Sequence, residues 1–562
     1  MAKVHLKVFT ADSLCSVPIE SLITLFTIKY CNSSVQIVFV KDTKPVGENS
    51  FIIDISTFQY EFIEYFQVSK IARCCEFPNL EENDNSCIAG LCATLRQIIQ
   101  NVLIEQPLHY CKELLGFKES CLLSCSEGSV WTRFCELDII STVRSIIVEN
   151  QDSNLPIALA RFEYHMSQPV RLHNLCKYTM SKKFIDNKIK QHENTVPEHI
   201  FAEGLTLTLA DIIIFVCVHM IFNFISKKHV HNIIPLTLKW YENILTNQNI
   251  LKVLNIFYIK SLDTENFIFN YTLPCIENKS LYKTDPKRYK PRNRIYTRQE
   301  DIEYALGLIR KSEMQIQIDE CFGQEINLDW ESIPYDATPE GGDLPSTRSQ
   351  RKFQQLESLC KPILKLAKEG NTIVDFCSGG GHLGILLAYL LPNCNLILLE
   401  NKAKSMKKAK ERIKKLLLSN ITFYQSNLNY FKGPFDIGTC LHACGVATDL
   451  VLQQCIEKNA IFVCCPCCYG SLKDCHSIVY PRSQIFKDIM DQQSYLVLSH
   501  AADQTHGINN AKTKQGYECM MLIDTDRKLQ AEECGYSVRL NKLIPESCSP
   551  KNHLLIGYPR LK

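Results

Sequence analysis

The sequence predicts a multidomain α/β protein whose last domain is a doubly wound parallel sheet. The short β-branched run Thr372–Phe376 is followed by a glycine turn, Ser378–Gly381, and then by an apolar helix. The same alternation of strand and helix recurs as far as Ala460–Cys464. The chain of 562 residues is also long enough for several domains, each with its own core.

The composition indicates a soluble globular protein, with 46% hydrophobic and 22% charged residues. The formal net charge is only +2, so any attraction to nucleic acid must be local. The most apolar helix candidate, Leu209–Ile225, contains Asp211 and is too short in its apolar run to cross a membrane. The 28 cysteines occur singly and in doublets, and no secretory signal precedes them, so we expect reduced thiols and a cytoplasmic protein.

Residues 1–80 predict a small α/β unit. Val4–Thr10 alternates like a strand, Ile19–Tyr30 has helical spacing, and Val35–Val40 and Phe51–Ile55 have the composition of further strands. This order is thioredoxin-like in outline, although the unit lacks a Cys-x-x-Cys redox pair.

Residues 87–265 predict a helical domain, with the polar segment Glu81–Ser86 as the boundary before it. Apolar residues recur at spacings of three and four in Ile88–Val102, in Phe134–Val148 and in Leu209–Ile225.

The last of these helices has a start signal. Thr208 can cap it, and Asp211, three residues on, can bond back to the Thr208 amide. With Gly204 and Thr206, this pattern resembles the buried capping motif of the glutathione transferase (GST) C-terminal domain, and a capping box on any buried helix is the alternative. The Glu-Ser pair that holds glutathione in that family is absent from residues 56–75, so we expect no glutathione transfer. The resemblance instead implies a module for packing, for partner binding or for homodimer formation.

Residues 271–345 form a connector with a basic stretch. Between Lys279 and Arg298, eight Lys and Arg residues are interleaved with three tyrosines and face a single acid, Asp285. Cations of this kind neutralise phosphates while tyrosines stack on bases, so RNA is a candidate partner. The alternative is a solvated linker between two domains.

Residues 350–562 predict the doubly wound domain. Its predicted elements before the C-terminal end are the helix Ser358–Ala367, the strand Thr372–Phe376, the helix Ile385–Leu391, the strand Asn395–Leu399, the helix Lys402–Leu418, and the strands Ile421–Gln425, Phe435–Leu441 and Ala460–Cys464. The predicted elements that follow are the strands Tyr495–Leu498, Tyr536–Ile544 and His553–Tyr558.

A first strand ending in Asp375 and a second ending at Glu400 resemble class I S-adenosylmethionine-dependent methyltransferases, which have a Rossmann-like fold. Their first motif has a glycine where this chain has Cys377, while Gly379 and Gly381 align with its later glycines. A nicotinamide-binding Gly-x-Gly-x-x-Gly pattern is also satisfied, but its glycines lie late relative to the strand, so the methyltransferase interpretation is favoured.

Two further segments are more specific. The segments Leu441–Leu450 and Phe462–Gly470 resemble a methyltransferase group that includes the tRNA acceptor-stem 2′-O-methyltransferases. This resemblance implies S-adenosylmethionine as cofactor and RNA, tRNA-like, as the favoured substrate. The residues implied to bind the cofactor are Asp375, Ser378, Gly379, Gly380 and Gly381 at its methionine and ribose end, Glu400 at the ribose hydroxyls, Asn427 near the adenine, and Leu441 at the methyl group.

His442 is the candidate catalytic base for a hydroxyl substrate, with Asp449 and His500 expected behind it. A structural histidine bonded to backbone is the alternative. The cysteines around Cys465 and Cys468 have the spacing of one zinc hook, with Cys440 and Cys444 as a potential second. Because thiols also pack as small hydrophobic groups, we predict no metal centre.

Nearly the whole chain resembles the family of glutathione S-transferase C-terminal domain-containing proteins. The favoured function is methylation that depends on S-adenosylmethionine. The alternative is a non-catalytic, GST-like interaction or scaffold protein with a degenerate methyltransferase fold, which the cysteine at position 377 motivates.

Overall fold

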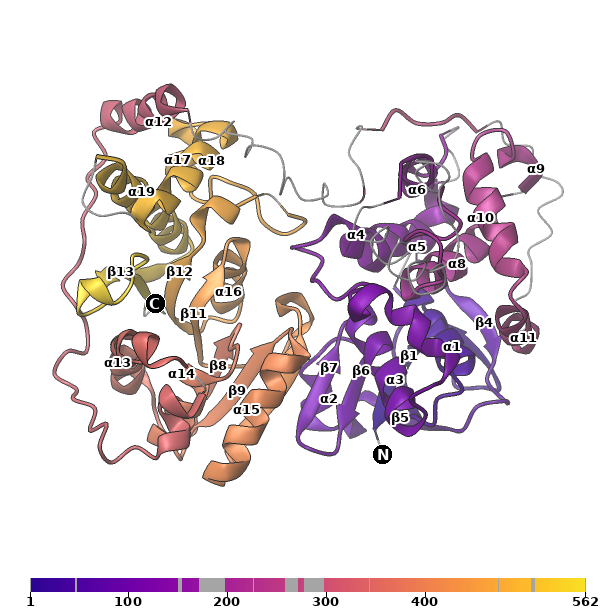
Figure 1. Cartoon of the computed structure of the whole chain (residues 1–562), viewed down its shortest axis with the longest axis horizontal. Coiled ribbons are helices and arrows are strands. Elements are labelled where there is room, and N and C mark those ends of the chain that lie inside the picture. Colours follow the sequence, from indigo (N-terminus) through magenta and orange to yellow (C-terminus); the bar gives the residue numbers. More distant parts are fainter. Residues whose placement is uncertain are drawn as a thin grey trace, which may run out of the picture. The chain divides into compact units, whose positions relative to one another are not determined.

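The computed structural model forms two compact units, residues 1–289 and 290–562 (Figure 1). It describes residues 2–45, 48–149, 154–170, 198–225, 227–257, 271–276, 281, 298–342, 344–473, 475–506 and 511–560. Most of the basic stretch Lys279–Arg298, on which RNA contact is predicted, lies outside the described residues.

The sheet of the first unit has the strand order β7-β6-β1-β3-β5. Strand β1 pairs in parallel with β3, β3 with β5, and the β6–β7 hairpin joins β1 antiparallel. A separate antiparallel pair is formed by β2 and β4. The bounds are β1 Lys3–Val8, β2 Leu14–Val17, β3 Gln36–Lys41, β4 Phe51–Asp54, β5 Tyr60–Glu64, β6 Asn79–Glu82 and β7 Ser86–Ala89.

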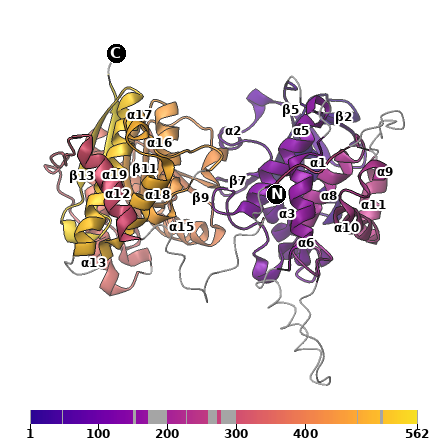
Figure 2. The same cartoon turned by 90° about the horizontal axis from the view of Figure 1, so that it is seen from above.

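Helices complete the first unit, and α10 and α11 lie next to each other, with α8 also packed against α10 (Figure 2). The main helices are α1 Ile19–Tyr30, α3 Leu91–Glu105, α5 Ile139–Glu149, α6 Ile157–Ser167, α8 Leu209–Ile221, α10 Pro235–Leu245 and α11 Gln248–Ile256, and the single turns are α2 Lys70–Arg73, α4 Val130–Arg133 and α9 Lys227–Val230. One continuous hydrophobic core joins the strands to these helices. The segment Glu81–Ser86, expected as a boundary, lies in the β6–β7 hairpin.

The second unit has the strand order β13-β14-β12-β11-β8-β9-β10. Its strands are β8 Thr372–Phe376, β9 Asn395–Glu400, β10 Ile421–Ser426, β11 Ile437–Cys444, β12 Ile461–Cys467, β13 Tyr536–Lys542 and β14 His553–Pro559. All the pairs from β12 to β10 are parallel, and β14 is antiparallel to both of its neighbours. The chain therefore winds outward from β8 to β10 and then crosses back to β11.

Helices cover both faces of this sheet, because right-handed crossovers in opposite directions place them on opposite sides. Helices α14 and α15 contact β9, and α15 lies along the sheet (Figure 1), while α16 contacts β11, β12 and α19. The main helices are α12 Gln299–Lys311, α13 Ser346–Leu366, α14 His382–Leu390, α15 Ala403–Leu416, α16 Val446–Glu457, α17 Gln484–Ile489, α18 Gln492–Ala501 and α19 Ala511–Glu533. The predicted fold class, multidomain α/β with a Rossmann-like final sheet, is confirmed.

One predicted element is wrong. Tyr495–Leu498, expected as a strand, lies inside helix α18. The carboxylate of Asp491 accepts the Ser494 amide at 2.9 Å and so caps this helix. Ser494, Val497, Leu498 and Ala501 are buried at helical spacing, a period that the short apolar run concealed.

The part of the chain that the structure describes contains no helix both long enough and apolar enough to cross a membrane.

Candidate functional site

The predicted site residues come from the carboxyl ends of neighbouring parallel strands. Asp375 is in β8, Glu400 ends β9, Asn427 follows β10, and Leu441 and His442 are in β11. Strands β8 and β11 are neighbours in the sheet. From β8 the chain adds strands on one side, β9 and β10, and then crosses to the other side to form β11 and β12, so the carboxyl ends of β8 and β11 mark a topological switch point. Ligands of open α/β sheets bind at such a crevice.

The two carboxylates hold the glycine bend in place. Asp375 is buried, and its Oδ2 accepts the amide of Gly384 at 2.9 Å. The Glu400 carboxylate accepts the amide of Gly379 at 2.8 Å and that of Lys402 at 2.9 Å. Burial raises the pKa of Asp375 to about 7, and the nearby charge of Glu400 adds to the increase. The two carboxylates therefore lie at the same end of the sheet, close enough for the charge of Glu400 to affect the ionisation of Asp375.

Open space faces the bend at Gly379. Its φ is +56°, and a Cβ atom added there meets nothing within 4 Å. Gly384 is the opposite case, since a Cβ there would lie 2.1 Å from the Leu398 side chain. The hydroxyl of Ser378 is buried and finds no hydrogen-bond partner among the described residues. An open bend beside an unsatisfied hydroxyl fits a polar ligand at this point.

Cys377 takes the place of the first motif glycine without losing the turn. Its φ is +55°, the left-handed region that glycine reaches easily and other residues seldom adopt. Gly381, with φ +73°, then begins helix α14. The substitution keeps the bend at the expense of local backbone strain.

His442 lies at a break in the β11–β12 ladder, where the register shifts between Leu441 and Ala443. Its φ is +67°, again left-handed. Its Nε2 lies 3.2 Å from Oε1 of Gln355, and that amide is itself oriented because its Nε2 donates to the Cys548 carbonyl. An amide oxygen only accepts, so His442 donates from Nε2 and, when neutral, keeps Nδ1 as an acceptor. Burial and the charge of Lys352 lower the pKa of His442 to about 4.

Lys352, on helix α13, is a candidate that the sequence analysis missed. Its ammonium acts electrostatically on Asp375, and the charge of Asp375 opposes the decrease that burial causes in the pKa of Lys352. The Lys352 charge also adds to the decrease that burial causes in the pKa values of His382 and His442. A lone lysine on an amphipathic helix gives no sequence signal of this placement.

The other predicted residues differ in their surroundings. Asn427 and Leu441 are half-buried at the same edge. Asp449 is not a partner of His442, and that prediction is wrong. Its carboxylate is buried and binds the guanidinium of Arg527 at 2.8 and 3.0 Å and the hydroxyl of Tyr480 at 2.7 Å. The apolar interior requires such a compensating charge, so Asp449 serves the packing of α16 against α19.

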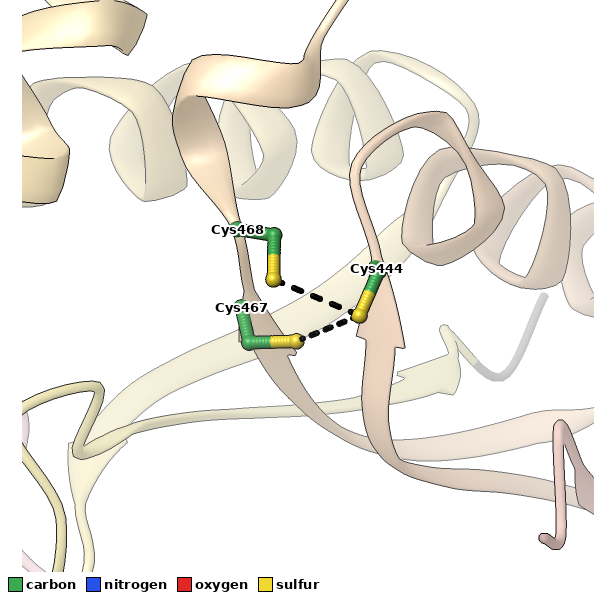
Figure 3. A group of neighbouring side chains, drawn as sticks. All are labelled: Cys444, Cys467 and Cys468. Atoms are coloured by element: carbon green, nitrogen blue, oxygen red, sulfur yellow. Dashed lines mark hydrogen bonds between the residues drawn. The ribbon is translucent and has the colours of Figure 1, made fainter. Parts of the chain in front are cut away.

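Three cysteines meet at the ends of β11 and β12. The Sγ of Cys444 lies 3.4 Å from that of Cys467 and 3.3 Å from that of Cys468 (Figure 3). Hydrogen bonds from Cys467 and Cys468 lower the pKa of Cys444 to about 6. The hooks weighed from the sequence, Cys465 with Cys468 and Cys440 with Cys444, are thus replaced by a different trio.

Comparisons with known proteins show what the chain is similar to. A family model described as "Methyltransferase domain" matches residues 351–475. The chain is 45% identical to the glutathione S-transferase C-terminal domain-containing protein homolog of Drosophila melanogaster, over 86% of this chain and 85% of that relative. It is 34% identical to the human glutathione S-transferase C-terminal domain-containing protein, over 97% of this chain and 96% of that relative. The chain is also 36% identical to ribosomal RNA small subunit methyltransferase G of Chlorobaculum tepidum over 66 residues, which are 12% of this chain and 30% of that protein. The predicted family is confirmed: the chain belongs to the glutathione S-transferase C-terminal domain-containing proteins.

Proposed function

We propose that the second unit transfers a methyl group from S-adenosylmethionine to a hydroxyl group of RNA. The observation that carries this proposal is the open glycine bend between Asp375 and Glu400, at the switch point of a methyltransferase domain. Bound S-adenosylmethionine supplies an electrophilic methyl group on a positively charged sulfur.

The residues of the bend suit this cofactor. The buried hydroxyl of Ser378 is available to hydrogen-bond it, and Gly379 leaves room for it. The Glu400 oxygens each accept one amide and keep a second lone pair for ribose hydroxyls. Asp375 supplies negative charge near the cationic end of the cofactor. Asn427 and Leu441 border the same edge in this proposal, at the adenine and the methyl group.

His442 is the proposed base. In-line displacement forms the bond from acceptor oxygen to methyl carbon and breaks the bond from sulfur to methyl carbon, and the hydroxyl proton must leave. Neutral His442, with Gln355 binding its Nε2–H, presents Nδ1 to accept that proton. The low pKa keeps the ring in the neutral form at physiological pH.

RNA is the proposed acceptor because lysine and arginine side chains that could bind phosphates occur on the domain and in the segment before it. Helix α15 exposes Lys404, Lys407 and Lys414 on one side of the domain, and the basic stretch Lys279–Arg298 precedes it in the chain. The short match to a ribosomal RNA methyltransferase supports the same substrate class.

A radiolabel assay tests the proposal. Full-length protein is incubated with S-adenosylmethionine carrying a tritiated methyl group and with total cellular RNA, and label in RNA is counted. We expect transfer by the wild type, loss of transfer in His442→Gln with cofactor binding retained, and no change in His231→Gln, which alters an exposed histidine of the first unit.

Label in a protein or small-molecule fraction alone would contradict RNA as the acceptor. Cofactor binding without transfer to any fraction would favour the non-catalytic scaffold alternative.

A further inference from the structure

The three-cysteine cluster arises from two neighbouring strand ends. Cys444 ends β11, Cys467 ends β12, and the two residues are direct partners in the parallel ladder. Cys468 follows immediately. All three Sγ atoms lie within 4.8 Å of one another, and Figure 3 shows the side chains converging.

The local backbone is what makes this convergence possible. In a regular strand, consecutive side chains point to opposite faces, so Cys467 and Cys468 would not meet the same partner. Cys468 instead adopts φ +53°, which turns its side chain back toward Cys444. The register shift around His442, with its φ of +67°, brings Cys444 opposite Cys467. Two left-handed non-glycine residues thus accompany one sulfur cluster, a feature that random thiol packing does not require.

The sulfur spacing suits a metal ion. Tetrahedral zinc, with a Zn–S bond of about 2.3 Å, separates its sulfur ligands by roughly 3.8 Å. The observed contacts of 3.3 and 3.4 Å need only a small adjustment to reach this value. A disulfide, in contrast, would join only two of the sulfurs and leave the third unused.

We propose that Cys444, Cys467 and Cys468 bind a thiophilic divalent cation, Zn²⁺, through three thiolates. No other His, Cys, Asp or Glu of the described residues joins the group, and Cys444 is exposed, so the fourth coordination position faces solvent. Zinc sites with three protein ligands and an open position are of the catalytic type, in which the ion binds water or a substrate atom. The Sγ of Cys444 lies 3.5 Å from the backbone carbonyl oxygen of His442, so the cluster adjoins the main chain of the candidate base.

Metal analysis of the full-length protein tests this proposal. Protein is purified with a reducing agent and without chelators, and its zinc content is measured by mass spectrometry. We expect about one zinc ion per chain in the wild type and a large loss in Cys444→Ser. Cys475→Ser is the matched control, because this half-buried cysteine in the following loop lies outside the cluster. The control should retain its zinc.

A second readout is independent of copurified metal. Cobalt(II) added to metal-free protein should give the thiolate charge-transfer band and the intense visible bands of a tetrahedral site in the wild type and in Cys475→Ser, but not in Cys444→Ser. Because Cys444 is exposed, we expect the metal-free variant to melt at the same temperature as the metal-free wild type.

Equal zinc content in wild type and Cys444→Ser would overturn the proposal, as would peptide mapping that finds Cys444 in a disulfide with Cys467 or Cys468. Neither readout requires S-adenosylmethionine or RNA, so its outcome is separate from that of the methyl-transfer assay.

Discussion

At the scale of single residues, three residues of the candidate site share a left-handed backbone conformation. Cys377, His442 and Cys468 have φ values of +55°, +67° and +53°, and they lie at the ends of β8, β11 and β12. Cys377 and Cys468 are not among the residue types that most often adopt this region, which are glycine, asparagine, aspartate and histidine. Strain of this kind persists only where the surrounding structure imposes it, and it gathers at functional sites.

The ionisation of Asp375 predicts that cofactor binding depends on pH. Burial raises its pKa to about 7, so the carboxyl is largely ionised at pH 8 and largely protonated at pH 6. A cationic ligand prefers the ionised form, so the affinity for S-adenosylmethionine should fall about tenfold from pH 8 to pH 6. Calorimetric titration at the two pH values measures this, and Asp375→Asn should bind weakly with no such dependence. An affinity in the wild type that is equal at both pH values would contradict the role of Asp375.

The charge of Lys352 should affect the pH dependence of cofactor binding through the pKa of Asp375. Its positive charge partly offsets the increase in the pKa of Asp375. In Lys352→Met the pKa of Asp375 should therefore rise further, and the midpoint of the pH profile for cofactor binding should move to higher pH. Lys361→Met, on the same helix but paired with Glu357, is the control and should leave the midpoint in place. A shift to lower pH in Lys352→Met would exclude this electrostatic role.

At the scale of elements, the capping box of α8 is confirmed. The Asp211 carboxylate is buried and accepts the Thr208 amide and hydroxyl at 2.8 and 2.9 Å. It also accepts the Ala202 amide at 2.6 Å and the indole of Trp240 at 2.9 Å. The sequence predicted the contact with the Thr208 amide because it is local, whereas the contacts with Ala202 and Trp240 join more distant segments and carried no signal.

These contacts predict unequal effects on stability. Asp211→Ala leaves several buried donors unpaired and should lower the free energy of unfolding of the first unit by about 3 kcal/mol or more. Thr208→Ala removes one cap and should cost only about 1 kcal/mol. Urea unfolding followed by tryptophan fluorescence, to which Trp131 and Trp240 contribute from the first unit, measures both changes. Equal losses in the two variants would show that Asp211 acts only as a helix cap.

Helix α19 shows why some elements could not be predicted from the sequence. Helix α19 was not predicted, because Asp524, Asp526 and Arg527 are buried in it beside apolar residues, so the helix lacks separate polar and apolar faces. Arg527 neutralises Asp524 and Asp449, and Asp526 binds the backbone and hydroxyl of Ser483. The inward-facing charges satisfy one another only in the folded chain, so hydrophobic periodicity fails there. The strands and glycine bend of the candidate site were predictable because they depend on local pattern.

At the scale of the whole molecule, buried histidines in both units predict acid sensitivity. Burial lowers the pKa of His165 in the first unit and of His382 in the second to about 3. The unfolded chain, with a histidine pKa near 6.5, then binds more protons than the folded chain, so stability decreases as pH falls below about 6.5. At pH 5 each histidine should reduce the free energy of unfolding by on the order of 2 kcal/mol. Melting curves at pH 7.5 and pH 5 measure this, and His165→Gln should flatten the dependence in the first unit. Identical melting temperatures at both pH values would contradict it.

Homodimer formation, a cytoplasmic location and RNA contact by the basic stretch stay predictions. The family and the fold class were recognisable because their signals run along the chain, from the Thr208 capping box to the glycine bend after Asp375. Lys352, Gln355 and the cysteine trio were not, because each depends on tertiary placement.

Binding of S-adenosylmethionine, measured by calorimetry, tests the central claim most directly. Gly379 and Gly370 both have positive φ and open space at the Cβ position, but Gly370 lies before β8, at the opposite end of that strand. Alanine therefore strains both backbones alike and fills the proposed pocket only in Gly379→Ala. The account predicts that the wild type and Gly370→Ala bind the cofactor equally well. It predicts that Gly379→Ala binds the cofactor with an affinity lower by roughly tenfold or more. A wild type that does not bind, or two glycine variants with the same affinity, would contradict it.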